Sequence, residues 1–227
     1  MMDAVQGTQW LAMAFACGEG EDGSSSLRPA VERAIGASAR VVRSRDGVVT
    51  AVREGRPLRD ERAFVEEARA QVAAELGDAR ASAGLGIPRR APAGLQVSAL
   101  QAEQALLLGR ALRGEGRTTA FTDLGPYCFV LGQPTSDLRD FCGRILGPLA
   151  GEDGRHAHLI RTLEAYLHGH GSVNAVARDL FLHRNTVRQR LRRIAALTGA
   201  DLNDAESRLA LHLAVLGRRA LAEMLAR

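Results

Sequence analysis

Apolar residues recur at helical spacing in the last third of the chain, most clearly between residues 172 and 198. One face of the first segment carries Val173, Val176, Ala177 and Leu180. Ser172 precedes this face and is a suitable N-cap, because its hydroxyl can accept a hydrogen bond from an otherwise unpaired backbone N–H. After residues 181–183 the rhythm restarts, with Val187, Leu191 and Ile194 on one side. The pattern predicts two short helices joined by a tight turn, the second spanning about residues 184–198.

Two more helices are predicted around this pair. Residues 158–167 carry leucines at positions 159, 163 and 167, and the segment from 205 to about 225 carries leucines at 209, 213 and 216. Gly199 follows the second central helix and suits the left-handed position that often ends a helix. We therefore expect residues 155–227 to form an all-α domain of four helices.

The first two-thirds of the chain alternates between strands and helices. Strands are predicted at residues 10–17, 40–45, 48–53, 82–87 and 118–121, and helices at residues 61–76, 98–112 and 138–149. A further helix ends at Ile35 and is opened by Ser25 or Ser26, with Pro29 in its first turn. The step Asp46-Gly47 between two Val-rich runs favours a type I′ hairpin.

Up to residue 87 the element order is β-α-β-β-α-β, the split arrangement of a ferredoxin-like sandwich. The expected fold class is therefore α+β, with a ferredoxin-like domain over residues 1–150. Residues 151–154 are polar and lack apolar periodicity, so we place the domain boundary there. The helical domain follows over residues 155–227.

The second central helix carries polar side chains suited to double-stranded DNA. Opposite its apolar side lie Asn185, Gln189, Arg192 and Arg193, with Arg188 on the flank. Arginine can bond bidentately to guanine and Asn or Gln to adenine, while further arginines neutralise phosphates. An ordinary solvated basic face usually includes acids, whereas residues 183–198 contain none. The pattern favours a recognition helix in the major groove.

The distribution of charge supports the same interpretation more strongly than its total. All 30 basic residues are arginines, which indicates GC-rich coding, so arginine content alone is weak evidence for nucleic acid. Residues 1–154 hold 18 arginines against 20 acidic residues, whereas residues 155–227 hold 12 against 6. The basic excess therefore belongs to the helical domain.

Metal and disulfide chemistry find little support. Cys17, Cys128 and Cys142 are widely spaced without a C-x-x-C motif, which indicates neither a disulfide framework nor a zinc ribbon. The two His-x-His pairs, at 156 and 158 and at 168 and 170, lack the neighbouring ligands of a metal site. The apolar run at residues 9–17 is too short to span a membrane and no basic residue precedes it. A buried strand in a cytoplasmic protein is expected.

Catalytic motifs are also absent from the sequence. It contains no G-x-x-x-x-G-K-[ST], G-x-S-x-G or H-E-x-x-H, and Gly84-x-Gly86 lacks a third glycine that opens a helix. The latter reads as a strand with small residues. We expect no catalytic residues, cofactor or metal.

The N-terminal strand order nevertheless raises one enzymatic alternative. Palm domains of nucleotide cyclases, including GGDEF-type diguanylate cyclases, share this order and carry Gly-Gly-Asp/Glu-Glu-Phe in the hairpin. Here residues 43–48 read Arg-Ser-Arg-Asp-Gly-Val, without the paired glycines or consecutive acids. Metal-assisted phosphoryl chemistry needs clustered carboxylates, and the nearby candidates are only Glu19, Glu21 and Asp22. This alternative therefore stays secondary.

The helical domain resembles a known family over about 70 residues. The most specific stretch is His-Arg-Asn-Thr-Val-Arg-x-Arg-Leu-Arg-Arg-Ile at residues 183–194. Supporting matches occur at residues 163–167, 171–173, 177–178, 197–202 and 208–211. Together they resemble the C-terminal helix-turn-helix of PucR/CdaR-type bacterial transcriptional regulators. The preceding domain is similar to the degenerate GGDEF-like domain found upstream in that family, chiefly at residues 123–127 and 146–149.

The resemblance implies a set of residues at or near DNA. These are Arg184, Asn185, Thr186, Arg188, Gln189, Arg192 and Arg193, to which the N-cap Ser172 adds a phosphate contact. Two positions depart from the family pattern. Gln189 replaces a residue that is often aromatic, and Phe181 occupies the turn, where a smaller or polar residue is usual. Because positive φ is costly for a bulky residue, we expect a different turn or a ring packed in the core.

The leading hypothesis is a sequence-specific transcriptional regulator that binds DNA as a homodimer or higher homo-oligomer. One helix-turn-helix reads few base pairs, so useful affinity requires two half-sites about a helical turn or a multiple apart. Residues 1–150 would provide dimerisation or receive a small-molecule effector. Many family members carry a further sensory domain, for which this chain has no room. Two alternatives are a signalling-nucleotide receptor or cyclase with DNA-binding output, and a nucleoid-type protein of low sequence preference.

Overall fold

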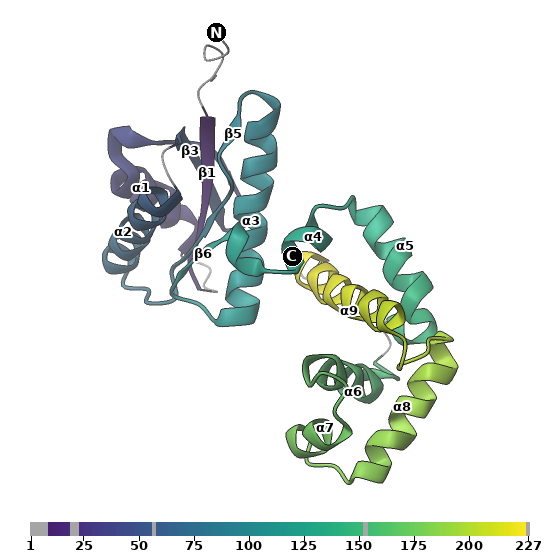
Figure 1. The fold of residues 1–227 in the computed structure, drawn as a ribbon. Coiled ribbons are helices and arrows are strands. Elements are labelled where there is room, and N and C mark those ends of the chain that lie inside the picture. Colours follow the sequence, from purple (N-terminus) through teal and green to yellow (C-terminus); the bar gives the residue numbers. More distant parts are fainter. Residues whose placement is uncertain (1–8, 19–22, 56–57, 152–153, 226–227) are drawn as a thin grey trace. The chain divides into compact units, whose positions relative to one another are not determined.

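The computed structural model describes residues 9–18, 23–55, 58–151 and 154–225. Within it the chain divides into two compact units (Figure 1). The first comprises Met1–Cys128 together with Glu223–Arg227, and the second comprises Phe129–Ala222. We call them the α/β unit and the helical unit. Each is described separately below.

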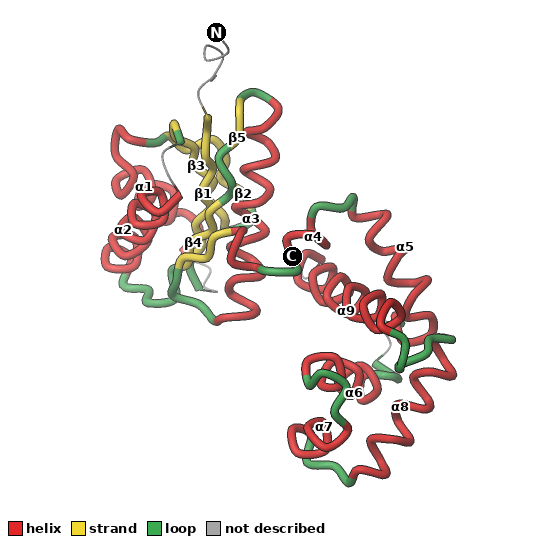
Figure 2. Tube along the Cα trace, in the orientation of Figure 1, coloured by secondary structure: helices red, strands yellow, loops and turns green. Residues whose placement is uncertain are grey.

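A mixed sheet forms the centre of the α/β unit (Figure 2). Strand β1 (Gln9–Ala16) lies between β3 (Val48–Glu54) and β4 (Ser82–Leu85) and pairs antiparallel with both. Strand β2 (Arg40–Arg45) extends the sheet beyond β3, and β6 (Thr118–Ala120) pairs parallel with β4. The resulting order is β2-β3-β1-β4-β6, so the first strand of the chain is central. This position explains why residues 11–16 are all buried.

The two faces of β1 carry side chains of different size. Leu11, Met13 and Phe15 pack with α1 (Gly23–Ile35) and α2 (Leu58–Leu76). Alanines 12, 14 and 16 share a cluster with α3 (Ala93–Arg113) on the other face. Because successive residues of a strand point to opposite faces, this alternation separates a large-residue layer from a small-residue layer. The small layer lets α3 lie close to the sheet.

Gly84 of β4 marks the closest approach of α3 to the sheet. A Cβ atom added at Gly84 would lie 2.0 Å from the carbonyl oxygen of Ala102 and 2.4 Å from the backbone nitrogen of Leu106. At Gly86 it would lie 2.2 Å from the carbonyl oxygen of Ser98. The Gly-x-Gly pair is therefore a packing feature, since only glycine leaves room for the backbone of α3 at these positions.

Gly84→Ala is expected to destabilise the α/β unit by about 1–3 kcal/mol, because the clash is with backbone atoms that cannot rotate away. Denaturation followed by the fluorescence of Trp10, the one tryptophan of the chain, would measure the effect. Gly143→Ala is the control, because a Cβ atom there meets no atom within 4 Å on helix α5. It should leave the Trp10 transition in place and stabilise α5 slightly. An unchanged Trp10 midpoint for Gly84→Ala would contradict this account.

The predicted hairpin is confirmed. Asp46 and Gly47 have φ angles of 51° and 71°, as both central residues of a type I′ turn require. Strands β2 and β3 pair antiparallel on either side of this turn. Local turn chemistry was therefore sufficient to place the hairpin, whereas the pairing of β2 with β3 shifts register between Val41 and Arg43.

Several element limits differ from those that the pattern predicted. Helix α1 begins at Gly23, so Pro29 lies inside the helix and not in its first turn. Helices α2 and α3 begin three and five residues earlier than expected. Arg89 and Arg90, for which no strand was predicted, form strand β5 beside β1, although their side chains remain exposed. Strand β5 forms because Arg89 and Arg90 pair with β1, which is far away in the sequence. A local pattern of apolar and polar residues does not predict such a pairing.

The helical unit contains α5 (Thr135–Leu146), α6 (Ala157–His168), α7 (Val173–Asp179), α8 (Arg184–Thr198) and most of α9 (Ala205–Leu225). The short helix α4 (Tyr127–Leu131), which was not predicted, leads into it. The α+β class with a C-terminal helical region is confirmed. No helix within the described ranges is both long and apolar enough to cross a membrane.

Helix α5 belongs to the helical unit, which moves the division of the chain upstream of the expected boundary at residues 151–154. The thiol of Cys142 donates a hydrogen bond to the carbonyl oxygen of Ala214 on α9, at 3.3 Å. Opposite it, Gly217 has no side chain, and a Cβ atom there would lie 2.7 Å from the Cys142 sulfur. The structure therefore divides after Cys128. The polar composition of residues 151–154 was the reason to expect a boundary there, whereas packing against α9 decides where α5 belongs; residues 152–153 lie outside the described ranges.

Candidate nucleic-acid interface

Helices α7 and α8 are each capped by a side chain. The Ser172 hydroxyl accepts a hydrogen bond from the backbone N–H of Ala175 at 3.2 Å, which confirms the predicted N-cap. His183 plays the same role for α8, where its Nδ1 accepts from the backbone N–H of Asn185 at 3.2 Å. This second cap was not predicted, because histidine is not among the usual N-cap residues. The two caps mark where α7 and α8 begin.

The orientation of α8 follows from its buried side. Val187 and Ile194 are fully buried and Leu191 is nearly so, as the apolar spacing predicted. Arg190 also points inward, because its guanidinium donates a hydrogen bond to the Thr162 hydroxyl of α6 at 3.2 Å. This contact explains why one of the five arginines of α8 is half-buried and unsuited to reach a ligand.

The outward side of α8 carries most of the predicted contact residues. Six of them are exposed: Arg184, Asn185, Arg188, Gln189, Arg192 and Arg193. Ser172 at the start of α7 is exposed as well, whereas Thr186 is half-buried. The Arg188 guanidinium donates a long hydrogen bond, 3.4 Å, to the side-chain oxygen of Asn185 one turn earlier. The helix therefore presents guanidinium and carboxamide groups on one continuous surface.

The electrostatic setting of this surface is positive. No acidic residue occurs between His183 and Thr198, and Gly199 in a left-handed conformation ends the helix. Among the described residues, the exposed arginines of α8 form no ion pair. Their charges are thus available to an anionic partner such as a phosphate backbone.

The turn between the two helices differs from the expectation. Phe181 has a φ of 53° and an exposed fraction of 95%, so it neither avoids the left-handed region nor packs in the core. The turn is held by hydrogen bonds from the backbone N–H groups of Phe181 and Leu182 to the carbonyl oxygens of Arg178 and Ala177. Buried residues fix the helices on both sides. These hydrogen bonds therefore hold the backbone of the turn between them in one conformation.

Two histidines of the helical unit, His168 and His212, contact each other. The rings of His168 and His212 contact edge to face, with centroids 5.4 Å apart, and the Nδ1 of His168 is bonded to the carbonyl oxygen of Glu164 at 2.8 Å. Burial, followed by the neighbouring His168, lowers the pKa of His212 below its ordinary value. Within the described part of the chain, no three metal-ligating side chains come together.

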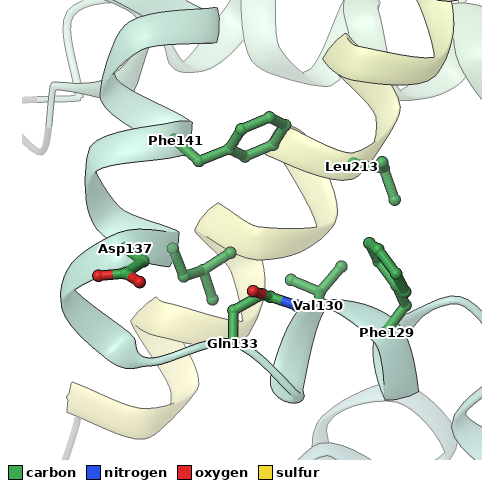
Figure 3. Close-up of a pocket in the computed structure, with 7 residues that line it drawn as sticks. Phe129, Val130, Gln133, Asp137, Phe141 and Leu213 are labelled. Atoms are coloured by element: carbon green, nitrogen blue, oxygen red, sulfur yellow. The ribbon is translucent and has the colours of Figure 1, made fainter.

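An apolar cavity of about 250 Å³ lies elsewhere in the helical unit, between α4, α5 and α9. Figure 3 shows the rings of Phe129 and Phe141 and the side chain of Leu213 around a common space. Its lining includes one carboxylate, that of Asp137.

The hairpin of the α/β unit is the other place where acidic residues were considered. Asp46 occupies the hairpin turn and pairs with Arg45 at 3.0 Å. Glu19, Glu21 and Asp22 lie outside the described residues. Among the described residues, neither the apolar cavity nor the hairpin turn has the clustered carboxylates of a magnesium site.

Two capped helices joined by a four-residue turn, with the second presenting an acid-free polar face, define a helix-turn-helix domain. Comparison with protein families agrees. Residues 159–216 match the PucR C-terminal helix-turn-helix domain. The resemblance to PucR/CdaR-type regulators is thus confirmed for this domain.

Curated relatives extend the likeness. An uncharacterized protein of Thermomonospora curvata is 43% identical over 81 residues, 36% of this chain and 45% of that protein. The purine catabolism regulatory protein of Bacillus subtilis is 36% identical over 86 residues, 38% of this chain and 16% of that protein. The carbohydrate diacid regulator of Escherichia coli is 31% identical over 142 residues, 62% of this chain and 36% of that protein. Each match spans less than half of the relative's length.

Proposed function

We propose that this chain is a sequence-specific DNA-binding transcriptional regulator and not an enzyme. The observation that carries the proposal is the outward face of α8, where every polar side chain is an arginine, asparagine or glutamine and no acid interrupts them. Two relatives named as regulators, from Bacillus subtilis and Escherichia coli, match part of this chain and support the proposal.

In the proposed complex, α8 lies in the major groove with its N-terminal half against the base edges. Asn185 and Gln189 are matched to adenine, and the arginines at 184, 188, 192 and 193 to guanine or to phosphate. Thr186, half-buried, would contribute at the edge of the contact. Ser172 would touch phosphate from the start of α7, since its hydroxyl keeps a hydrogen to donate while its oxygen accepts from Ala175.

A dimer or higher homo-oligomer is part of this proposal. A single recognition helix contacts few base pairs, so two copies on half-sites about one helical turn apart would supply the affinity and the specificity. The α/β unit is proposed to provide dimerisation or to receive a small-molecule effector. Double-stranded DNA is the proposed partner.

The α/β unit is proposed to be a ferredoxin-like, degenerate GGDEF-like domain. In its favour, β1 pairs antiparallel with β3 and β4, and β2 follows β3 at the edge, as the split β-α-β-β-α-β order requires. The parallel strand β6 extends this arrangement beyond β4. A non-catalytic role is proposed because the hairpin at residues 43–48 lacks the paired glycines and the consecutive acids of a cyclase.

Selection from a random duplex pool tests the function. The full chain is expected to enrich a sequence motif with two similar half-sites, and to bind it about 10³-fold or more tightly than random duplex at physiological salt. Gel-shift titration at two protein concentrations would report both affinity and stoichiometry. Equal retention of selected and random duplexes would instead support the nucleoid-type alternative. Absence of any DNA retention would refute the proposal altogether.

A further inference from the structure

Phe181 stands out in the turn between α7 and α8. Its φ of 53° lies in the region that L side chains rarely adopt, and its ring is 95% exposed. Among the described non-glycine residues, positive φ otherwise occurs only at Asp46 and His170. Aspartate and histidine tolerate this conformation several-fold better than a bulky aromatic residue does. Phe181 therefore combines an unfavourable backbone with an unpacked apolar ring.

Because it is 95% exposed, the Phe181 ring contributes little packing to the stability of the free protein. The backbone of the turn is fixed by the hydrogen bonds of Phe181 and Leu182 to Arg178 and Ala177, at 3.2 and 2.9 Å, which involve no side chain of Phe181. A glycine would adopt the same φ without strain. Local strain of this kind is concentrated at functional sites, so the positive φ of Phe181 points to a partner that contacts this residue.

The position of Phe181 indicates which partner that is. It lies three positions before Arg184, and three residues of chain span at most roughly 10–11 Å. A major groove is about 12 Å wide. With the N-terminus of α8 at the base edges, a ring at position 181 reaches the sugar-phosphate wall of the same groove. Exposed Arg178 and Arg184 on either side supply positive charge toward that wall, against the single acid Asp179.

We propose that the Phe181 ring packs against DNA, on the apolar surface of a deoxyribose or a thymine methyl group at the edge of the half-site. The proposal rests on the proposed DNA-binding function and adds an apolar contact to its arginines and carboxamides. Phenylalanine is among the side chains that contact the thymine methyl in the major groove. Burial of this ring against DNA would provide hydrophobic free energy, which the nearly fully exposed ring does not provide in the free protein.

The test uses variants that separate the backbone from the ring. Phe181→Gly and Phe181→Asn both relieve the positive φ and remove the ring, and asparagine does so without the flexibility of glycine. Both should raise the melting temperature of the full chain. Both should also weaken binding to the duplex selected by the wild-type protein by roughly tenfold. Phe181→Leu keeps an apolar side chain and the strain, so it should retain most of the affinity with no gain in melting temperature.

Two further readouts identify the contact. Because Phe181 carries no charge, the slope of log affinity against log salt should stay unchanged in all three variants, unlike that of an arginine variant. Replacing thymines of the selected duplex one at a time with uracil removes single methyl groups. A thymine contact predicts one position where uracil weakens the wild-type protein and not Phe181→Gly. A sugar contact predicts no such position.

Wild-type affinity in both Phe181→Gly and Phe181→Asn would overturn the inference and leave the proposed function intact. If the wild-type protein selected no duplex, the proposed function would fail and this inference with it. The two failures are therefore distinguishable from the wild-type measurement alone.

Discussion

Replacing both Arg188 and Arg192 with alanine is expected to weaken binding to the selected duplex by roughly 2–6 kcal/mol, since each arginine contact contributes about 1–3 kcal/mol. The two side chains lie one turn apart on the exposed face of α8 and neither forms an ion pair within the described chain. Their loss leaves base or phosphate oxygens without donors inside the interface. Fluorescence anisotropy at several salt concentrations would measure the affinity and its salt slope.

Single variants assign each arginine its role. A relaxed preference at one base pair, with most of the salt slope kept, identifies a base contact. A uniform loss over all sequences, with a slope shallower by about one, identifies a phosphate contact. The matched control is Arg139→Ala with Arg144→Ala, which removes the same charge from the exposed side of α5 in the same unit. Equal weakening by the control pair would mean that general charge, and not the α8 surface, holds the DNA.

Arg53→Ala is expected to cost about 3–5 kcal/mol of the free energy of unfolding of the α/β unit, because it breaks a buried ion pair by removing one partner. The Arg53 and Glu61 side chains are 6% and 0% exposed, with Nε and Oε2 3.5 Å apart. The guanidinium also lies over the Phe64 ring, 4.1 Å from its centroid. Chemical denaturation monitored at Trp10 would measure the change.

Two comparisons make this prediction specific. Arg45→Ala breaks the Arg45–Asp46 pair of the same hairpin, whose side chains are 79% and 65% exposed, and should cost less than about 1 kcal/mol. The double variant Arg53→Met with Glu61→Leu removes both charges and should recover most of the stability, since apolar side chains of similar size can replace a buried pair. If Arg53→Ala unfolded at the wild-type denaturant midpoint, the pair would not be a stabilising element.

Much of the candidate interface could be predicted from local pattern. Helices α8 and α9 span the predicted residues, and the spacing of Val187, Leu191 and Ile194 correctly separated the outward arginines from the core. The Ser172 cap and the Asp46-Gly47 turn were also predicted correctly from the sequence. Helical periodicity, capping and turn preferences act over a few residues, so the amino-acid order alone carries them.

Other features depend on which surfaces meet. That α5 packs on α9 and not on the α/β unit follows from Cys142 and Gly217, which are 75 residues apart in the sequence. Gly84 matters because α3 crosses it, and Arg190 turns inward because Thr162 of α6 accepts its hydrogen bond. None of these partners is local, so no short-range pattern could have named them.

Phe181 lies between the two cases. Its place in a tight turn could be read from the interrupted periodicity, and the cost of a bulky residue at positive φ was the reason to expect another conformation. The neighbouring helices decide otherwise, because Val176 and Val187 are fully buried on either side and the turn between them has no freedom to relax. The local preference of phenylalanine for negative φ therefore identified the strained position. The packing of the two neighbouring helices nevertheless imposes a positive φ on Phe181 and leaves its ring exposed.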